Sequence, residues 1–300
     1  MTDTATVFLI MNGEAAEDAD LREMVQRLRE RNYCIEPRVT WEGGDAGRYT
    51  EEACRAGADA IAACGGDGTL HEVVNAMMGF DKRPMLGGLP YGTGNDFLGG
   101  IGVEPRHGPE QFEQWLGLAP TPIDVGYDGE RHFLNMATAG VGAEVTAEAS
   151  RQLKEVAGSF AYFVRGIPAA LDIPTRHAII RAPELEWEGD LAFFFVGNGP
   201  RSGGGWRLCP AARINDGLLD VLIVPDMPLR EMARHGREMV KAETPGDYGP
   251  MKYRQVEWVE VEFDEEVAIN LDGEPAGGEE VRFSVVKEAV RFLVPPASDD

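Results

Sequence analysis

The stretch ACGGDGTLHEVVNAM, residues 63–77, places three glycines around one aspartate, Asp67, between an apolar run and a helix-like pattern. The preceding run, residues 58–63, is small and apolar, as a buried parallel strand can be. Apolar residues then recur at helical spacing. Thr69 and Glu72 form the sequence pattern of a capping box, which predicts that the helix begins at Thr69. The glycines are therefore expected in the turn where a strand leads into a helix.

This glycine turn has two interpretations. The free N–H groups and positive dipole end of a helix N-terminus bind anions, above all phosphate, and glycine lets a ligand approach the backbone. Taken alone, a glycine pair is more typical of a tight turn that needs positive φ. Asp67 is unusual beside a phosphate, because a carboxylate repels that ligand unless a metal or a water lies between them.

The sequence around this turn alternates between strand-like and helix-like segments. Such alternation predicts a parallel sheet with right-handed crossovers, whose ligands bind at the carboxyl ends of the strands. The expected strands are residues 7–11, 34–39, 58–63 and 85–90, and the expected helices include residues 20–31 and 50–56.

From about Ile123 the pattern changes to short, aromatic-rich apolar runs bounded by turns, which indicates an antiparallel β domain. The boundary is expected near residues 124–128, which gives domains 1–126 and 127–300. The expected strands of the second domain are residues 132–137, 191–196, 218–224, 256–263, 267–271 and 281–286.

Bulk composition narrows the class of protein. The 300 residues include 51 acidic and 28 basic side chains, a net charge of -23, which argues against nucleic acid as a partner. The four cysteines have no zinc-like spacing and are expected to be reduced thiols. The acidic N-terminus does not resemble a signal peptide, and no apolar stretch reaches roughly 18 residues. We therefore expect a soluble, cytoplasmic protein.

A second glycine cluster, PYGTGNDF at residues 90–97, follows the fourth expected strand. Its position mirrors that of the first cluster, so both loops are expected at one edge of the sheet, where Thr93, Asn95 and Asp96 converge with Asp67. Asn95 and Asp96 alone are equally typical of a turn. Two glycine–aspartate loops at consecutive strand ends are much more specific than either loop alone.

At this point the sequence resembles a known family. GGDGT followed by GTGNDF is similar to the diacylglycerol-kinase catalytic family, and the motifs IDVG (123–126), LCPAARINDGLLDV (208–221) and NLDGEP (270–275) are similar to its YegS-like bacterial lipid kinases. The resemblance extends from about residue 9 to residue 275. It implies ATP-dependent phosphorylation of a lipid hydroxyl by a Rossmann-like α/β N-terminal domain and a C-terminal antiparallel β-sandwich-like domain, with the active site in the cleft.

The resemblance also implies roles for individual residues. Asp67, Asp96 and Asp124 correspond to the aspartates around the phosphates and the metal. The Asp216 carboxylate and the backbone oxygens of Arg213 and Leu218 correspond to the Mg²⁺ site, and Glu274 corresponds to the general base. The implied nucleotide-binding positions are Asn12, Thr40, Gly66, Asp67, Gly68, Thr69, Leu70, His71, Glu72, Thr93 and Asn95.

Elementary chemistry is compatible with these roles. The chain has no GxxxxGK[ST] motif, so metal, backbone amides and a helix N-terminus must neutralise the phosphates instead of a P-loop lysine. A carboxylate near the acceptor hydroxyl can remove its proton, and Mg²⁺ prefers oxygen ligands. Without the resemblance, the segments around Asp216 and Glu274 are more typical of hairpin turns.

Two residues depart from the family pattern. His71 stands where such sequences usually carry Asn, and Cys64 stands where Gly is common. His71 is either a hydrogen-bond donor at the nucleotide or a surface helix residue without a role, and Cys64 is expected to be a small buried filler.

Two segments of the second domain are candidates for contact with a membrane or with the substrate. The segment 151–181 carries a net charge of +3 around an apolar run, which suits an amphipathic helix at a bilayer surface or a helix packed on its own β domain. The glycine-rich residues 201–206 suit either a substrate contact or a hairpin connection. We expect transient contact with the inner face of a membrane and allow for a homodimer.

The expected activity is a Mg²⁺- and ATP-dependent lipid kinase acting on a glycerolipid such as diacylglycerol or phosphatidylglycerol. Asp96 favours this class, because kinases of sphingosine and ceramide usually lack the aspartate after GxGN. The alternatives are a sphingoid-lipid kinase, an enzyme resembling NAD kinase or phosphofructokinase, and a catalytically inactive nucleotide-binding membrane-associated protein.

Overall fold

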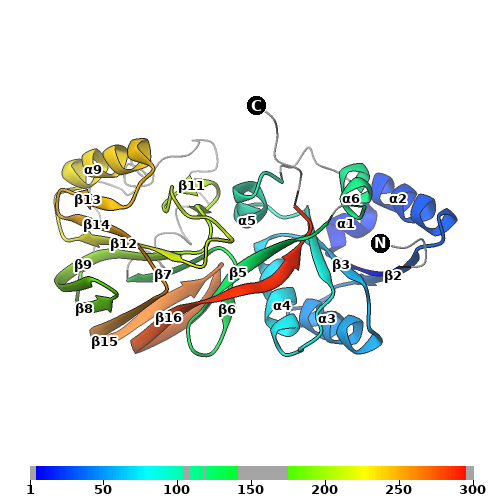
Figure 1. Cartoon of the computed structure of the whole chain (residues 1–300), viewed down its shortest axis with the longest axis horizontal. Helices are drawn as coiled ribbons and strands as arrows, with labels where there is room; N and C mark the ends of the chain where they lie inside the picture. Colours follow the sequence, from blue (N-terminus) through cyan, green and yellow to red (C-terminus); the bar gives the residue numbers. More distant parts are fainter. Residues whose placement is uncertain (1–4, 104–108, 118, 141–174, 295–300) are drawn as a thin grey trace. The chain divides into compact units, whose positions relative to one another are not determined.

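The computed structural model describes residues 5–103, 109–117, 119–140 and 175–294. The chain divides into two compact units (Figure 1). Unit 1 consists of residues 1–123 and 288–300, and unit 2 consists of residues 124–287.

Unit 1 is built around a parallel sheet in the strand order β4-β3-β1-β2, and the end of β16 pairs with β4 in parallel. Helices α3 and α4 cover one face of this sheet, and α1, α2 and α6 cover the other (Figure 1). The elements are β1 (Thr6–Met11), α1 (Gly13–Glu17), α2 (Ala19–Glu30), β2 (Cys34–Val39), α3 (Asp45–Ala56), β3 (Ala60–Gly65), α4 (Asp67–Met78), β4 (Met85–Pro90), α5 (Asp96–Gly100) and α6 (Pro109–Trp115).

Small residues in β3 and β4 allow the close packing of this unit. Every residue of β3 is buried. A Cβ atom at Gly87 would lie 2.6 Å from a ring carbon of Phe112 in α6, and one at Gly88 would lie 2.5 Å from a methyl carbon of Leu98 in α5. Both distances are shorter than real carbon contacts, so α5 and α6 pack closely because β4 carries glycine at these positions.

The predicted start of α4 is wrong. The helix begins at Asp67, its N-cap is Gly66, and no side chain caps it. Glu72 does not complete a capping box with Thr69; its carboxylate accepts hydrogen bonds from the backbone N–H groups of Gly44, Ala46 and Gly47 at the start of α3. The strand before it also continues to Gly65, two residues beyond the expected end. The local pattern failed because a neighbouring helix N-terminus competes for the same carboxylate.

Antiparallel pairs join the strands of unit 2 from β13 to β16, and β8 and β6 also pair antiparallel with their neighbours β9, β15 and β5. The strand order is β13-β14-β12-β9-β7-β15-β16, and β8 pairs with both β9 and β15. The elements are β5 (Thr121–Tyr127), β6 (His132–Phe133), β7 (Met136–Gly140), β8 (Arg176–Ala182), β9 (Leu185–Gly197), β10 (Arg201–Ser202), β11 (Trp206–Arg207), β12 (Leu219–Pro225), α9 (Leu229–Ala242), β13 (Gly246–Tyr248), β14 (Met251–Val256), β15 (Trp258–Leu271) and β16 (Glu274–Phe292).

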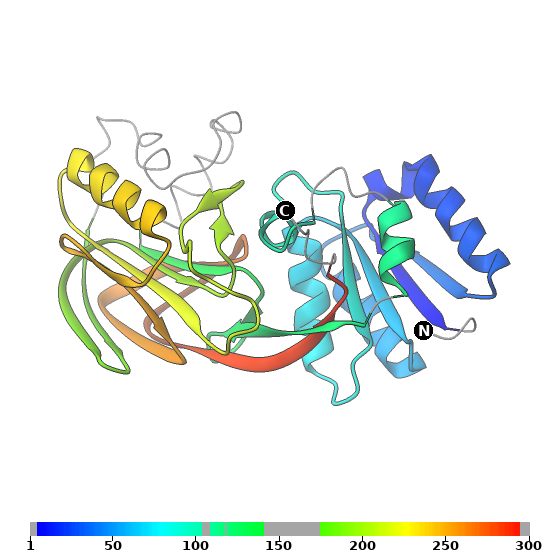
Figure 2. The same cartoon turned by 45° about the horizontal axis from the view of Figure 1, so that its top comes forward.

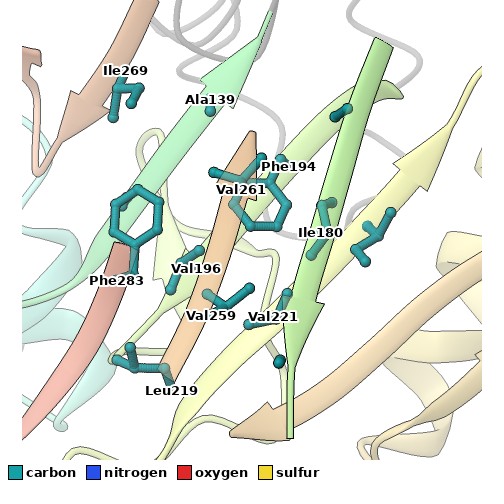
Figure 3. Packing of buried hydrophobic residues seen from close by; sticks show 14 of the residues in the cluster. Ala139, Ile180, Phe194, Val196, Leu219, Val221, Val259, Val261, Ile269 and Phe283 are labelled. Atoms are coloured by element: carbon teal, nitrogen blue, oxygen red, sulfur yellow. The ribbon is translucent and has the colours of Figure 1, made fainter. Parts of the chain in front are cut away.

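Strand β9 supplies side chains to two cores, because successive residues of a strand point to opposite faces. Phe194 and Val196 pack with residues of β12, β15 and β16 (Figure 3). Phe193 and Phe195 pack on the other face with residues of β12, β14 and α9, which lies along these strands (Figure 2). Strand β9 therefore lies between two apolar layers, one shared with strands β12, β15 and β16 and one that includes residues of α9.

The predicted fold class is confirmed: an α/β, Rossmann-like N-terminal region is followed by an antiparallel, β-sandwich-like region. The expected run 132–137 is interrupted at Leu134 and Asn135 and forms two strands, β6 and β7. Residues Arg201–Arg207 form the β10–β11 hairpin.

The expected amphipathic helix over residues 151–181 is wrong at its C-terminal end, where Arg176–Ala182 form strand β8 between β9 and β15. Ala178 and Ile180 alternate with outward side chains and are buried, so the apolar residues there follow the period of a strand. Residues 151–174 lie outside the described residues. Within the described parts of the chain, none of the helices combines the length and apolarity that a membrane span requires.

Candidate functional site

Backbone and side-chain hydrogen bonds join the carboxyl ends of β2, β1, β3 and β4 at one edge of the unit 1 sheet. Thr40 donates from its N–H (2.8 Å) and its hydroxyl (3.2 Å) to the carbonyl of Met11. Asn12 donates from its N–H to Cys64 O (3.0 Å) and from Nδ2 to Tyr91 O (2.8 Å). Asn12, Thr40 and the glycine turn after β3 therefore lie along a single edge, as the strand order requires.

The two glycine loops lie against each other at this edge. A Cβ atom at Gly92 would lie 2.3 Å from the Cα of Gly66 and 2.9 Å from its nitrogen. Asn95 adopts a left-handed conformation, φ 53°, and its side chain both donates to and accepts from the backbone of Gly92. Only glycine permits this contact between two backbones, so both loops require glycine for reasons of space.

Asp67 joins the two loops through its carboxylate. Its Oδ2 accepts a hydrogen bond from Asp96 N (3.0 Å), and its Oδ1 accepts one from Phe97 N (3.1 Å). Asp67 thus satisfies N–H groups at the start of α5, a role that sequence analysis missed. The expected convergence of Asp67, Asn95 and Asp96 is seen, and Thr93 is exposed on the same loop.

The first turn of α4 presents backbone N–H groups rather than long side chains. Gly66, Asp67, Gly68 and Thr69 surround the helix N-terminus, whose N–H groups have no intrahelical partners and attract anions. Leu70 and His71 are buried, 1% and 6% exposed, so the interpretation of His71 as a surface residue is wrong. The helix turns His71 toward the interior of unit 1. Cys64 is fully buried, as expected for a filler, and burial raises the pKa of its thiol.

Asp124 belongs to unit 2 and holds the loop that carries Asp216. Its Oδ2 accepts a hydrogen bond from Gly217 N (2.7 Å), and its own N–H donates to Ile214 O (2.6 Å). Asp67 and Asp96 lie in unit 1, so the three aspartates that the resemblance grouped together fall into different units. In the structure, Asp124 fixes the 213–218 loop, which contains the expected metal ligands Arg213, Asp216 and Leu218.

Carboxylates near this loop have raised pKa values. Partial burial raises the pKa of Asp216; the Leu218 N–H, which donates to its Oδ1 (3.0 Å), opposes the shift, and the nearby Asp124 carboxylate adds to it. Burial raises the pKa of Asp220 to about 7, against hydrogen bonds from Tyr253 and Gln255. Acidic groups in one another's field favour protonation or a bound cation.

Glu274 opens β16 directly after a two-residue hairpin turn. Asp272 (φ 53°) and Gly273 (φ 104°) form this turn, and Leu271 pairs with Glu274 across it. The turn interpretation of this segment therefore describes its backbone correctly. Glu274 itself is exposed, so its carboxylate is accessible to a substrate.

A network of hydrogen bonds connects the Glu274 hairpin to the Asp216 loop within unit 2. The Asp272 carboxylate accepts from the N–H groups of Leu134 (2.6 Å), Asn135 (2.9 Å) and Met136 (2.8 Å). Asn198, fully buried, donates from Nδ2 to Leu134 O (2.7 Å) and to Asp124 O (3.0 Å). Sequence analysis missed both roles. The NLDGEP motif contains Asp272, whereas no signal in the sequence marks Asn198.

Asp272→Asn is expected to lower the free energy of unfolding by about 1–3 kcal/mol. The wild-type carboxylate accepts hydrogen bonds through both oxygens, whereas the amide of asparagine turns an N–H₂ group toward one of the backbone N–H donors and leaves that donor without an acceptor. Asparagine tolerates the left-handed conformation of this position, so the backbone is not otherwise strained. Urea unfolding measures the difference. Asp264→Asn, an exposed position in the same strand pair, is the control, and equal losses in both variants would contradict the role of Asp272.

Comparisons with known proteins bear on the family and the fold of this chain. Residues 6–127 match the family model for the diacylglycerol kinase catalytic domain, and residues 135–294 match that for the YegS C-terminal NAD kinase beta sandwich-like domain. The chain is 39% identical over 290 residues to a "Probable lipid kinase YegS-like" of Pseudomonas putida, covering 97% of this chain and 95% of the relative.

Two further similarities cover nearly the whole chain. A relative of the same description from Chromohalobacter salexigens is 39% identical over 294 residues, covering 97% of this chain and 94% of the relative. The fold is similar to the crystal structure of a diacylglycerol kinase from Bacillus anthracis str. Sterne, with a TM-score of 0.77 at 21% identity and 98% coverage of both chains.

Proposed function

Because this chain belongs to the diacylglycerol kinase catalytic family and is a lipid kinase, we propose that it transfers the γ-phosphoryl group of ATP to the hydroxyl of a glycerolipid such as diacylglycerol or phosphatidylglycerol. The observation that carries this proposal is the contact between the loops at Gly66 and Gly92 beside the N-terminus of α4. Backbone N–H groups and a helix dipole there suit the phosphates of a nucleotide.

The nucleotide is proposed to lie along the sheet edge of unit 1. Within the run from Gly66 to Glu72, the backbone N–H groups of residues 66–69 at the start of α4 would bind the phosphates, because Leu70 N already donates to Gly66 O. Thr93 and Asn95 would border the phosphates from the second loop. Asn12 and Thr40 would border the nucleoside at the ends of β1 and β2. Phosphoryl transfer requires positioning and charge neutralisation more than covalent chemistry, and a rigid pair of loops suits that requirement.

Glu274 is proposed as the group that takes the proton from the lipid hydroxyl. It is exposed and follows a hairpin turn held by Asp272. A carboxylate within hydrogen-bonding distance of the hydroxyl removes its proton as the new P–O bond forms and the bond from the γ-phosphorus to the β,γ-bridging oxygen breaks. ADP leaves with that oxygen.

The loop at residues 213–218 has a donor set that fits Mg²⁺. The Asp216 carboxylate and the backbone oxygens of Arg213 and Leu218 are hard oxygen ligands, and Asp124 fixes the loop through Gly217 N. The pKa of Asp216, raised by partial burial and by the Asp124 carboxylate, is consistent with a position suited to a cation. When bound there, Mg²⁺ would neutralise acidic charge and order the loop. Asp67 and Asp96 are proposed to organise the phosphates together with a catalytic Mg²⁺.

Asp216→Asn is expected to remove the Mg²⁺-dependent part of the thermal stability. Saturating Mg²⁺ at 100 times its Kd stabilises a folded protein by about 2.7 kcal/mol, which is a measurable rise in Tm. The wild type should show this rise and the variant should not, as differential scanning calorimetry with and without Mg²⁺ would reveal. Asp226→Asn is a matched control outside the loop; an equal Mg²⁺ response in wild type and Asp216→Asn would contradict the metal assignment.

The substrate class is tested with γ-labelled ATP, Mg²⁺ and mixed micelles of diacylglycerol, phosphatidylglycerol, monoacylglycerol, ceramide or sphingosine. Label in the organic extract is expected with a glycerolipid. Label only in ceramide or sphingosine would overturn the glycerolipid assignment in favour of a sphingoid acceptor. The acceptor is proposed to be met at the inner face of a membrane. Of the segment 151–181 considered for that contact, residues 151–174 lie outside the described residues, and Arg176–Ala182 form strand β8.

A further inference from the structure

Trp41 is the most exposed large apolar side chain in the part of the chain that the structure describes. It is 93% exposed, and Val39, at 46%, is the other large hydrophobic residue that is exposed among the described residues. Burying a tryptophan removes an unusually large apolar area from water and is therefore favourable. The exposed ring of Trp41 does not contribute this free energy in the free protein. A ligand that covers the ring would recover it.

The backbone around Trp41 is held by hydrogen bonds. The Asp45 carboxylate accepts from Trp41 N (2.8 Å) and Glu42 N (3.2 Å), and it pairs with Arg48 (2.5 Å). Glu72 lies on α4, the helix that follows the glycine turn, and its carboxylate accepts a hydrogen bond from Gly44 N (3.1 Å). The loop is therefore attached to the helix whose N-terminus is proposed to bind phosphate, and Trp41 is presented at a defined position.

The strand order places Trp41 at the far end of the proposed nucleotide site. The glycine turns follow β3 and β4, Asn12 follows β1, and Thr40 with Trp41 follows β2, in the sheet order β4-β3-β1-β2. Adjacent strands are about 4.8 Å apart, so the β2 end lies roughly 10 Å from the β3 end along this edge. If the nucleoside lies beside Asn12 and Thr40, as proposed above, a nucleotide with its phosphates at the β3 turn would carry its ribose near β1 and its base near β2.

We propose that Trp41 stacks on the base of the bound nucleotide and is a binding residue of the site. This inference rests on the proposed function, because it needs nucleotide phosphates at the α4 N-terminus. Stacking on an aromatic ring is tolerant of base identity, since every base has a π face. Trp41 therefore contributes affinity for ATP and GTP alike rather than selecting adenine.

The test compares ATP with inorganic tripolyphosphate, which has the phosphates but no base. Titration calorimetry in Mg²⁺ is run on the wild type, Trp41→Ala, Trp41→Phe and the control Val39→Ala, the neighbouring exposed apolar residue. Trp41→Ala is expected to weaken the affinity for ATP and for GTP by about 5- to 30-fold and to leave the affinity for tripolyphosphate unchanged. Trp41→Phe should retain ATP affinity within about 3-fold, and Val39→Ala should match the wild type. Because Trp41 is exposed, none of these changes removes a core contact.

Several results would overturn the inference. Equal ATP affinity in the wild type and Trp41→Ala would exclude stacking. If Trp41→Ala lost as much affinity for tripolyphosphate as for ATP, the substitution would have changed the loop and not the contact with the base. A sedimentation assay with phosphatidylglycerol vesicles tests a lipid contact. If Trp41→Ala sediments with the vesicles less than the wild type does and its ATP affinity is unchanged, Trp41 belongs to a lipid-binding surface instead. A wild type that binds neither ATP nor tripolyphosphate would overturn the proposed function itself, and this inference with it.

Discussion

Glu274→Gln is expected to lower kcat by about 10²–10⁴-fold while leaving the affinity for ATP unchanged. Glutamine keeps the size of the side chain and its hydrogen-bonding capacity but cannot accept the hydroxyl proton. Glu274 is exposed at the start of β16, and the hairpin before it is held by Asp272 and not by Glu274. The fold should therefore be unaffected, and the whole effect should fall on the chemical step.

The measurement is the initial rate of label transfer to the best lipid acceptor, together with the Kd of ATP from calorimetry. Glu279→Gln, another exposed glutamate of β16, is the matched control and should retain full activity. A Glu274→Gln variant with more than about a tenth of the wild-type kcat would exclude this residue as the base. A loss confined to ATP affinity would place it at the nucleotide instead.

Gly92→Ala is expected to weaken ATP binding by about 10- to 100-fold and to lower activity at least as much. The added Cβ would lie 2.3 Å from Gly66 Cα and 2.9 Å from Gly66 N, so one of the two loops must move. The obstructing atoms are backbone and cannot rotate away as a side chain could, and overpacking of this kind typically costs about 1–3 kcal/mol. The displaced segment includes the N-cap of α4, and the movement therefore misplaces its phosphate-binding N–H groups.

Gly79→Ala is the matched control for this substitution. Gly79 follows α4, and a Cβ there would meet only Ala76 O at 3.5 Å, an ordinary contact. This variant should bind ATP as the wild type does. Circular dichroism and the cooperativity of thermal unfolding separate a displaced loop from a protein that has failed to fold. Wild-type ATP affinity in a folded Gly92→Ala variant would contradict the role proposed for the loop contact.

Much of the fold could be predicted because strand and helix periodicities are local. The expected strands at residues 34–39 and 85–90 match β2 and β4 at both ends, and the change to antiparallel strands after Ile123 is observed. The glycine clusters were placed correctly at strand ends, since glycine and aspartate mark turns within a few residues. Helix α9 was missed, although Leu229, Met232, Ala233, Met239 and Val240 recur there at helical spacing.

The hydrogen-bond partners of the carboxylates in the candidate site could not be predicted in the same way. Asp67, Asp96, Asp216 and Glu274 could be named as candidates from motifs, but the partners of Glu72 and Asp124 could not. Glu72 lies three residues from Thr69, and the local pattern predicted that pair; it bonds instead to backbone 28 residues away. Asp124 was grouped with the phosphate aspartates, and its observed hydrogen bond is to Gly217, 93 residues away.

By itself, the sequence determined which segments form strands and where the chain turns, because both depend on residues that are close along the chain. The acidic candidates for phosphoryl transfer came from the resemblance of its motifs to a known family. Only the tertiary structure decided which N–H groups each carboxylate satisfies. Asp67 caps a helix 29 residues further on, and Asp272 holds backbone 138 residues earlier. A carboxylate bonds to the donors that folding brings within about 3 Å of it, and sequence distance says nothing about which donors those are.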